Sequence, residues 1–74
     1  MITCYRVHAD ESQEKIGTWW HDDLIMQLVR WYSLERYSKE IKVVIERHAS
    51  GNDAFACIHD VANNEVVIIE LREE

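Results

Sequence analysis

Proline is absent from this 74-residue chain, glycine and cysteine occur twice each, and no apolar run is long enough to cross a membrane. The scarcity of proline and glycine leaves no candidate linker, so we expect a single small domain over residues 1–74. Two cysteines do not make a disulfide scaffold, which favours reduced thiols. The lack of a basic and apolar leader at the amino terminus also favours a cytoplasmic protein with no membrane partner.

Basic residues are scarce as well. Eight lysine and arginine residues stand against 14 aspartate and glutamate residues, giving a formal net charge of −6. Residues 1–23 and 53–74 are acidic, whereas residues 24–52 are basic. Phosphate contacts need lysine and arginine, so this balance disfavours direct nucleic-acid binding and suits a basic protein partner. Solubility alone is the simpler explanation of the charge.

The last third of the chain is patterned as two successive hairpins. Strand-like runs at residues 41–49, 54–61 and 65–72 are separated by turn-forming residues 50–53 and by Asn63-Asn64. If both loops have two residues, Ile45 faces Ile58, and Ile58 faces Ile69. The apolar face that results, which should pack on a helix, also contains Val43, Ala56, Val67 and Leu71.

The first half of the chain predicts a strand at residues 2–8, a loop at residues 9–16 and a helix at residues 19–37. Thr18 is the expected N-cap of this helix, and Asp22 and Asp23 lie in its first turn, where the helix dipole favours acids. Its apolar half contains Trp20, Leu24, Ile25, Leu28, Val29, Trp31 and Tyr32.

These elements predict an α+β fold of order β-α-β-β-β. One amphipathic helix packs on one face of a mostly antiparallel sheet that ends in a three-stranded meander. The pattern leaves open whether the first strand lies at the edge or in the middle of the sheet.

The sheet face opposite the helix is half apolar. Exposed apolar surface of this kind on a small protein is typical of a contact surface. Two alternatives remain: residues 9–16 fold over this face, or the face serves homodimerisation, by sheet stacking or by pairing of an edge strand. The predicted rows across it are His48–Phe55–Arg72, Glu46–Cys57–Glu70 and Val44–His59–Ile68, with Lys42, Val61 and Val66 beside them.

The same face gathers potential zinc ligands, namely Glu46, His48, Cys57, His59 and Glu70. They lack the short cysteine and histidine spacings of known zinc sites, so we predict no metal site and no cofactor. Cys57 with a histidine resembles a thiol and base pair, but no oxyanion donor and no pocket accompany it. We therefore predict no catalytic residue and no enzyme.

The leading functional hypothesis is a non-enzymatic, acidic protein-binding module. Small acidic domains of this kind include inhibitors and immunity-type antagonists, some of them carried by phages, whose carboxylates occupy the basic surface of a larger nucleic-acid-binding protein. Trp19 points away from the apolar half of the predicted helix, so it is either an exposed anchor or a cover for the preceding loop. The candidate partner-binding residues are Asp10, Glu11, Glu14, Trp19, Asp22, Asp23, Glu70, Glu73 and Glu74.

The alternative hypothesis is a small homo-oligomeric domain. Its open sheet face would form the self-interface, with or without a bound ligand or metal. A chain this short often gains stability from a second copy of itself.

Overall fold

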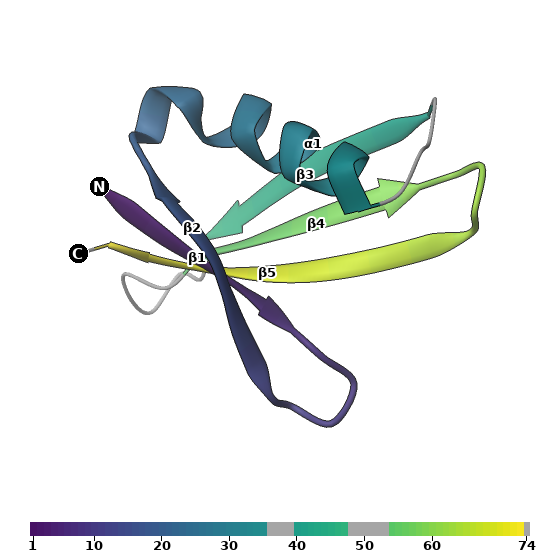
Figure 1. Cartoon of the computed structure of the whole chain (residues 1–74), viewed down its shortest axis with the longest axis horizontal. Coiled ribbons are helices and arrows are strands. Elements are labelled where there is room, and N and C mark those ends of the chain that lie inside the picture. Colours follow the sequence, from purple (N-terminus) through teal and green to yellow (C-terminus); the bar gives the residue numbers. More distant parts are fainter. Residues whose placement is uncertain (36–39, 48–53, 74) are drawn as a thin grey trace.

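The computed structural model describes residues 1–35, 40–47 and 54–73 and shows a small α+β domain (Figure 1). Within these residues, one antiparallel sheet of five strands, in the order β2-β1-β5-β4-β3, carries a single α-helix. Strand β1 therefore lies inside the sheet, and β2 and β3 form its edges. The elements are β1 (Ile2–Val7), β2 (Gln13–Trp19), the 3₁₀ turn η1 (His21–Asp23), α1 (Leu24–Glu35), β3 (Ile41–Arg47), β4 (Ala54–Asp60) and β5 (Glu65–Glu73).

The α+β class is confirmed, but the predicted order of elements is wrong in the first third of the chain. Residues 13–16, predicted as loop, belong to β2, which pairs with β1. The register shifts between Cys4, which faces Gly17, and Tyr5, which faces Lys15, so Ile16 is an extra residue in the ladder. This bulge breaks the two-residue alternation by which a strand is recognised in sequence.

The helix also begins later than predicted. Thr18 lies in β2 and is not an N-cap, whereas Asp22 and Asp23 lie in the first turn of η1, as expected for acids near a helix start. α1 itself runs over Leu24–Glu35, and the last residues of the predicted helix lie outside the described part of the chain.

The meander is confirmed, with a different register. Val43 faces Ile58, and Ile58 faces Val67, which is a shift of two residues in each hairpin. The β4–β5 turn holds four residues, since Asp60 faces Glu65. A shift of two preserves every face, because strand side chains alternate with period two. The predicted turn at Gly51-Asn52 lies outside the described residues.

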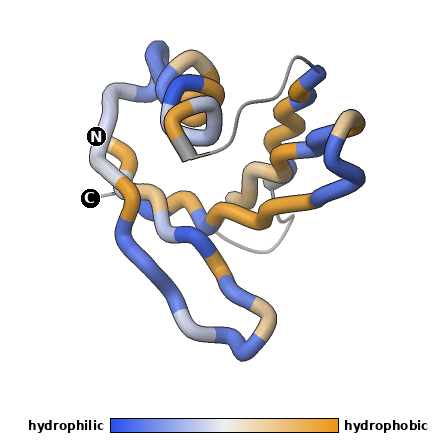
Figure 2. Tube along the Cα trace, turned by 45° about the vertical axis from the view of Figure 1, so that its right-hand side comes forward, coloured by the Kyte–Doolittle hydropathy of each residue, from blue (hydrophilic) through white to orange (hydrophobic). Residues whose placement is uncertain are grey.

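The core lies between α1 and the sheet, and the helix covers one sheet face while the β1–β2 hairpin extends away from it (Figure 1). Figure 2 shows that this extending hairpin is largely hydrophilic. Two residues predicted to be apolar contacts are partly exposed, Ile25 at 52% and Ile45 at 37%. The buried core contains Cys4, Leu24, Leu28, Tyr32, Ala56, Ile58, Val67, Ile69 and Leu71.

A buried carboxyl group joins the helix to the β4–β5 turn. Asp60 is 1% exposed and accepts a hydrogen bond from the Tyr32 hydroxyl at 2.7 Å. It also accepts hydrogen bonds from the backbone N–H of Asn63 at 3.2 Å and from the Asn63 side-chain amide at 2.7 Å. Because these donors come from both the helix and the turn, the position of the turn is tied to the packing of the helix.

Candidate binding surfaces

The sheet face opposite the helix, here called the open face, carries the described strand residues that were assigned to it from sequence, except that Val61 lies in the β4–β5 turn. Its rows differ from the predicted ones because of the register shift. Cys57 lies between Val44 and Ile68, where it was predicted to lie between two carboxylates. It is Phe55 that lies between Glu46 and Glu70. His59 lies between Lys42 and Val66, and His48 lies outside the described residues.

This arrangement separates the potential zinc ligands. In the part of the chain that the structure describes, no group of three or more cysteine, histidine or acidic side chains is placed to hold a metal ion. Cys57, His59 and Glu46 fall in three different rows of the open face. The two-residue shift is the cause, since it moves Cys57 out of the row that contains Glu46 and Glu70.

One part of the open face carries a polar network that the sequence did not reveal. The Arg72 guanidinium lies 4.4 Å above the centre of the Tyr5 ring and donates to Glu70 Oε1 at 2.8 Å. Arg72 also donates to Gln13 Oε1 at 2.5 Å, and the Gln13 amide donates to Glu70. These bonds bring together side chains from β1, β2 and β5.

The network changes the titration of its charged members. The Arg72 hydrogen bond is the main reason why the pKa of Glu70 is lowered, and Arg72 in turn has a raised pKa because of Glu70. Glu70 was predicted to be a partner-binding acid. In the structure its carboxylate is engaged by Arg72 and Gln13, so it is not an unpaired charge.

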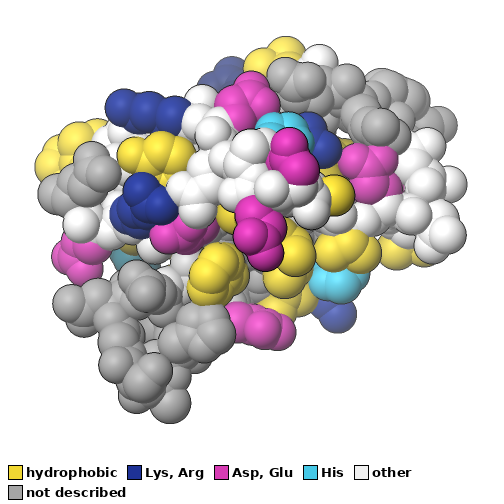
Figure 3. All heavy atoms as spheres, turned by 90° about the horizontal axis from the view of Figure 1, so that it is seen from below, with side chains coloured by type: hydrophobic (Ala, Val, Ile, Leu, Met, Phe, Trp, Pro, Cys, Tyr) yellow, Lys and Arg dark blue, Asp and Glu magenta, His cyan; other side chains and the backbone are white. Residues whose placement is uncertain are grey.

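The rest of the open face carries apolar side chains that are exposed or half-buried. Val66 and Ile68 are 57% and 43% exposed, and Val44, Phe55 and Cys57 are half-buried. Figure 3 views the molecule from the side opposite the helix and shows hydrophobic side chains interspersed with acidic, basic and histidine side chains. This part of the open face matches the predicted contact surface in composition.

The two cysteines lie on opposite faces of the sheet. Cys4 is fully buried in the core, and burial raises the pKa of its thiol to about 11, which keeps it protonated at neutral pH. Cys57 is half-buried on the open face. Both thiols are free.

A second apolar surface surrounds the start of the helix. Trp20, Ile25 and Met26 are 64%, 52% and 61% exposed. The sequence had placed Trp20 in the core and Trp19 outside, and the structure reverses them. Trp19 is the last residue of β2, is half-buried and packs against the core.

The reversal follows from the later start of the helix. In a helix from residue 19, Trp20 belongs to the apolar half, but here it precedes η1 in extended conformation and its side chain remains outside. Met26 lay outside the predicted apolar half. Only a correct helix start could have identified Trp20 as exposed, whereas the helical pattern had already left Met26 outside the apolar half.

Acidic residues that are distant in sequence, Asp22 and Asp23 in η1 and Glu73 at the end of β5, lie toward this part of the molecule. Ile2 pairs with Trp19 on one side and with Glu73 on the other. Glu73 therefore lies two strands away from Trp19, which directly precedes Trp20. Glu73 shares the helix side of β5 with the buried Leu71, because strand side chains alternate. We define the helix-start surface by the following residues: Trp20, Asp22, Asp23, Ile25, Met26 and Glu73.

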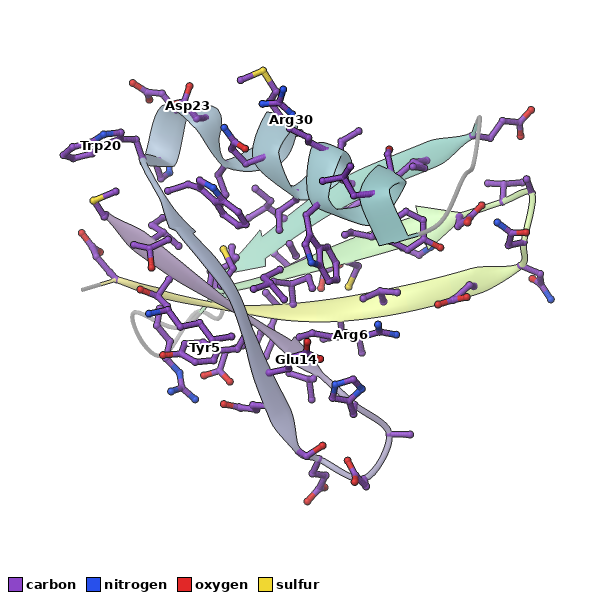
Figure 4. The ribbon with its side chains drawn as sticks, viewed as in Figure 1. Tyr5, Arg6, Glu14, Trp20, Asp23 and Arg30 are labelled. Carbon is purple, nitrogen blue, oxygen red and sulfur yellow. The ribbon has the colours of Figure 1, made fainter. Side chains whose placement is uncertain are left out.

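The remaining predicted acids lie elsewhere. Asp10 and Glu11 form the tip of the β1–β2 hairpin, and Glu14 follows in β2. Figure 4 places Glu14 on this hairpin, far from Trp20 and Asp23, which lie together at the helix start. Glu74 lies outside the described residues. The structure therefore distributes the described acids of the predicted surface over the hairpin, the helix start and the open face.

No protein family model, no curated protein and no solved structure matches this chain. In the described part of the chain, α1 is too short and too polar to cross a membrane.

Proposed function

We propose that this protein is a non-enzymatic protein-binding module that engages a basic protein through its helix-start surface. The observation that carries the proposal is the juxtaposition of three largely exposed apolar side chains, Trp20, Ile25 and Met26, with three carboxylates. The carboxylates belong to Asp22, Asp23 and Glu73.

Each part of this surface has a physical role in such a complex. Tryptophan is enriched among the side chains that dominate binding energy, and methionine adapts to irregular apolar surfaces. Carboxylates beside them attract lysine and arginine from a distance and set the orientation of the partner. The Asp22 side chain is fully exposed, at 100%, so it is accessible to a partner's cation.

Within this class, we favour an inhibitor or immunity-type antagonist of a nucleic-acid-binding protein. Carboxylates at the helix-start surface would occupy lysine and arginine side chains that otherwise contact phosphates. The net charge of −6 supports attraction to such a partner and opposes direct binding of nucleic acid. Two free cysteines on opposite faces of the sheet are compatible with the reducing cytoplasm.

A direct test uses the exposed tryptophan as its own reporter. Three amphipathic helical peptides of equal apolar content, one basic, one neutral and one acidic, are titrated into the protein while tryptophan emission is followed. We expect the basic peptide to shift the emission to shorter wavelength, with an affinity that falls as salt is added. Trp20→Ala should remove most of this shift and weaken binding roughly tenfold or more.

The matched control separates a site from general charge attraction. Asp22→Asn with Asp23→Asn, and Glu11→Gln with Glu14→Gln, change the net charge equally, but only the first pair lies at the helix-start surface. We expect only the first pair to weaken binding of the basic peptide. Equal weakening by both pairs, or equal binding of all three peptides, would refute the proposed site.

A further inference from the structure

Strand β3 is an edge strand well suited to pair with another strand. It pairs only with β4, and no strand within the described residues lies along its outer side. Its seven residues contain neither proline nor glycine, and four of them are β-branched: Ile41, Val43, Val44 and Ile45. An exposed, regular, apolar edge of this kind offers a row of backbone donors and acceptors to a further strand.

The hydrogen bonds to β4 determine which backbone groups point outward. The backbone N–H of Val61 donates to the carbonyl of Glu40 at 3.1 Å, so these two residues form a hydrogen-bonded pair. Such pairs recur at every second residue of an antiparallel ladder. The backbone groups of Lys42, Val44 and Glu46 therefore face β4, and those of Ile41, Val43 and Ile45 face outward.

We propose that β3 pairs antiparallel with β3 of a second copy of this chain, about a two-fold axis at Val44. In this register Val43 and Ile45 of the second copy form hydrogen-bonded pairs with Ile45 and Val43, using the outward groups. Lys42 lies opposite Glu46 of the second copy, and the two-fold axis repeats this contact. The inference goes beyond the proposed function and does not depend on it.

The charges on β3 select this register over its neighbours. The side chains of Lys42 and Glu46 are exposed, and neither has an ion-pair partner among the described residues. Centring the pairing on Val43 places Glu46 opposite Glu40, and centring it on Lys42 or Glu46 places two identical charges together. Centring it on Ile45 places Glu46 opposite Val44. Among these five centres only the axis at Val44 pairs opposite charges, and opposed like charges destabilise a sheet.

The same pairing covers apolar surface on both faces. On the helix side, Ile45, which is 37% exposed, would lie beside Val43 of the second copy. On the open face, the row Val44–Cys57–Ile68 would continue into the same row of the second copy. A single strand pair buries little area, so we expect a weak dimer whose population rises with concentration.

The opposite edge of the sheet lacks these properties. Strand β2 is interrupted by the bulge at Ile16 and by Gly17, and its residues Gln13, Glu14 and Lys15 are polar. Bulges, glycine and clustered polar side chains are common ways of protecting an edge from pairing. Lys15 therefore provides a matched control position: an exposed lysine on an edge strand where no pairing is proposed.

Sedimentation velocity across a wide concentration range tests the proposal. We expect the wild type to show a concentration-dependent dimer. Lys42→Glu and Glu46→Lys should each raise the dissociation constant roughly tenfold or more, because each places like charges opposite one another twice. Lys15→Glu, with the same change of net charge as Lys42→Glu, should leave it unchanged. Circular dichroism establishes that each variant is folded.

Mixing the variants provides the sharpest readout. A heterodimer of Lys42→Glu with Glu46→Lys restores two opposite-charge contacts, and so does a homodimer of the double variant. We expect both to regain near wild-type association. A wild type that stays monomeric at submillimolar concentration overturns the proposal. So does a mixture or a double variant that associates no better than the single variants.

Discussion

The β1–β2 turn and the β4–β5 turn contain the same local hydrogen bond and the same backbone conformation, but they differ in their contacts with the rest of the domain. In each, an aspartate accepts a backbone N–H bond, Asp10 from Ser12 at 3.0 Å and Asp60 from Asn63 at 3.2 Å. Each also contains one residue with positive φ, Glu11 at 69° and Asn64 at 50°. Asp10, however, is exposed, whereas Asp60 is 1% exposed.

The difference lies in what else each aspartate contacts. Asp10 accepts a second bond from the Ser12 hydroxyl at 2.5 Å, which belongs to the same turn. Asp60 accepts a bond from the Tyr32 hydroxyl on α1. The first turn is therefore a local structure, while the second is coupled to the core, and only the second should affect the stability of the whole domain strongly.

The largest effect is expected at Asp60. Asp60→Ala removes three hydrogen bonds from a buried position, one from Tyr32 and two from Asn63, so the free energy of unfolding should fall by about 2–4 kcal/mol. Asp60→Asn retains one acceptor oxygen and should cost less. Urea unfolding followed by circular dichroism measures both variants. A loss for Asp60→Ala as small as that of an exposed turn residue would contradict the coupling to the core.

The amino-terminal hairpin has its own anchor, which lies in the strand rather than in the turn. The Trp19 ring covers Gly17, and a Cβ added to Gly17 would lie 2.3 Å from Trp19 Cζ2. Gly17→Ala should therefore displace the indole and lower the free energy of unfolding by about 1–3 kcal/mol.

A double-mutant cycle tests this explanation. In a Trp19→Ala background, Gly17→Ala should cost much less, because the ring that it displaces is gone. An unchanged cost in that background would point to a backbone effect at Gly17 instead. Urea unfolding of the four proteins of the cycle provides the comparison.

A smaller effect, of opposite sign, is expected at the positive-φ residues. Glu11→Gly should raise the free energy of unfolding by about 0.5–1 kcal/mol, because glycine adopts positive φ without a Cβ clash. Asn64→Gly should change it little, since asparagine already tolerates this conformation. Thermal unfolding of both variants measures the contrast, and equal gains would contradict it.

The smallest effect concerns pH at the exposed turn. The Ser12 hydroxyl, followed by the Ser12 backbone N–H, lowers the pKa of Asp10. A lowered pKa means that the contribution of Asp10 to stability is present above its unfolded-state pKa and is lost as pH falls through its folded-state pKa. Asp10→Asn should therefore reduce the acid-side dependence of stability slightly. Urea unfolding at neutral and acidic pH should show a smaller difference for this variant than for the wild type.

The carboxy-terminal part of the fold was predictable because its pattern is redundant. Alternation along β4 and β5 assigns the same faces whether the turn holds two residues or four, so Ile58 and Ile69 are correctly placed in the core despite the wrong register. The rows across the open face were not predictable, because they depend on the turn length itself. For that reason the predicted neighbours of Cys57 are wrong while its face is right.

The prediction for the amino-terminal part was wrong where the strand pattern of β2 and the helical pattern overlap. β2 is a polar edge strand with a bulge, and only Trp20 separates it from η1. Trp19 and Trp20 therefore also fit the helical pattern of the residues that follow, although Trp19 belongs to the strand. The helix start predicted at Trp19 precedes η1 by two residues, and this error exchanges a half-buried tryptophan for an exposed one. The helix-start surface was consequently missed as a unit, although Asp22, Asp23 and Glu73 had been named singly.

The order of residues along this chain was enough to determine the α+β class, the helix-facing side of the meander and the excess of acids, because each depends on local periodicity or on composition. Tertiary structure alone decided that β1 lies between β2 and β5, that Glu73 lies two strands from Trp19 and that β3 is left as an edge of the described sheet. Those features arise from pairing between strands distant in sequence, where the free energy comes from long-range contacts that no short segment encodes.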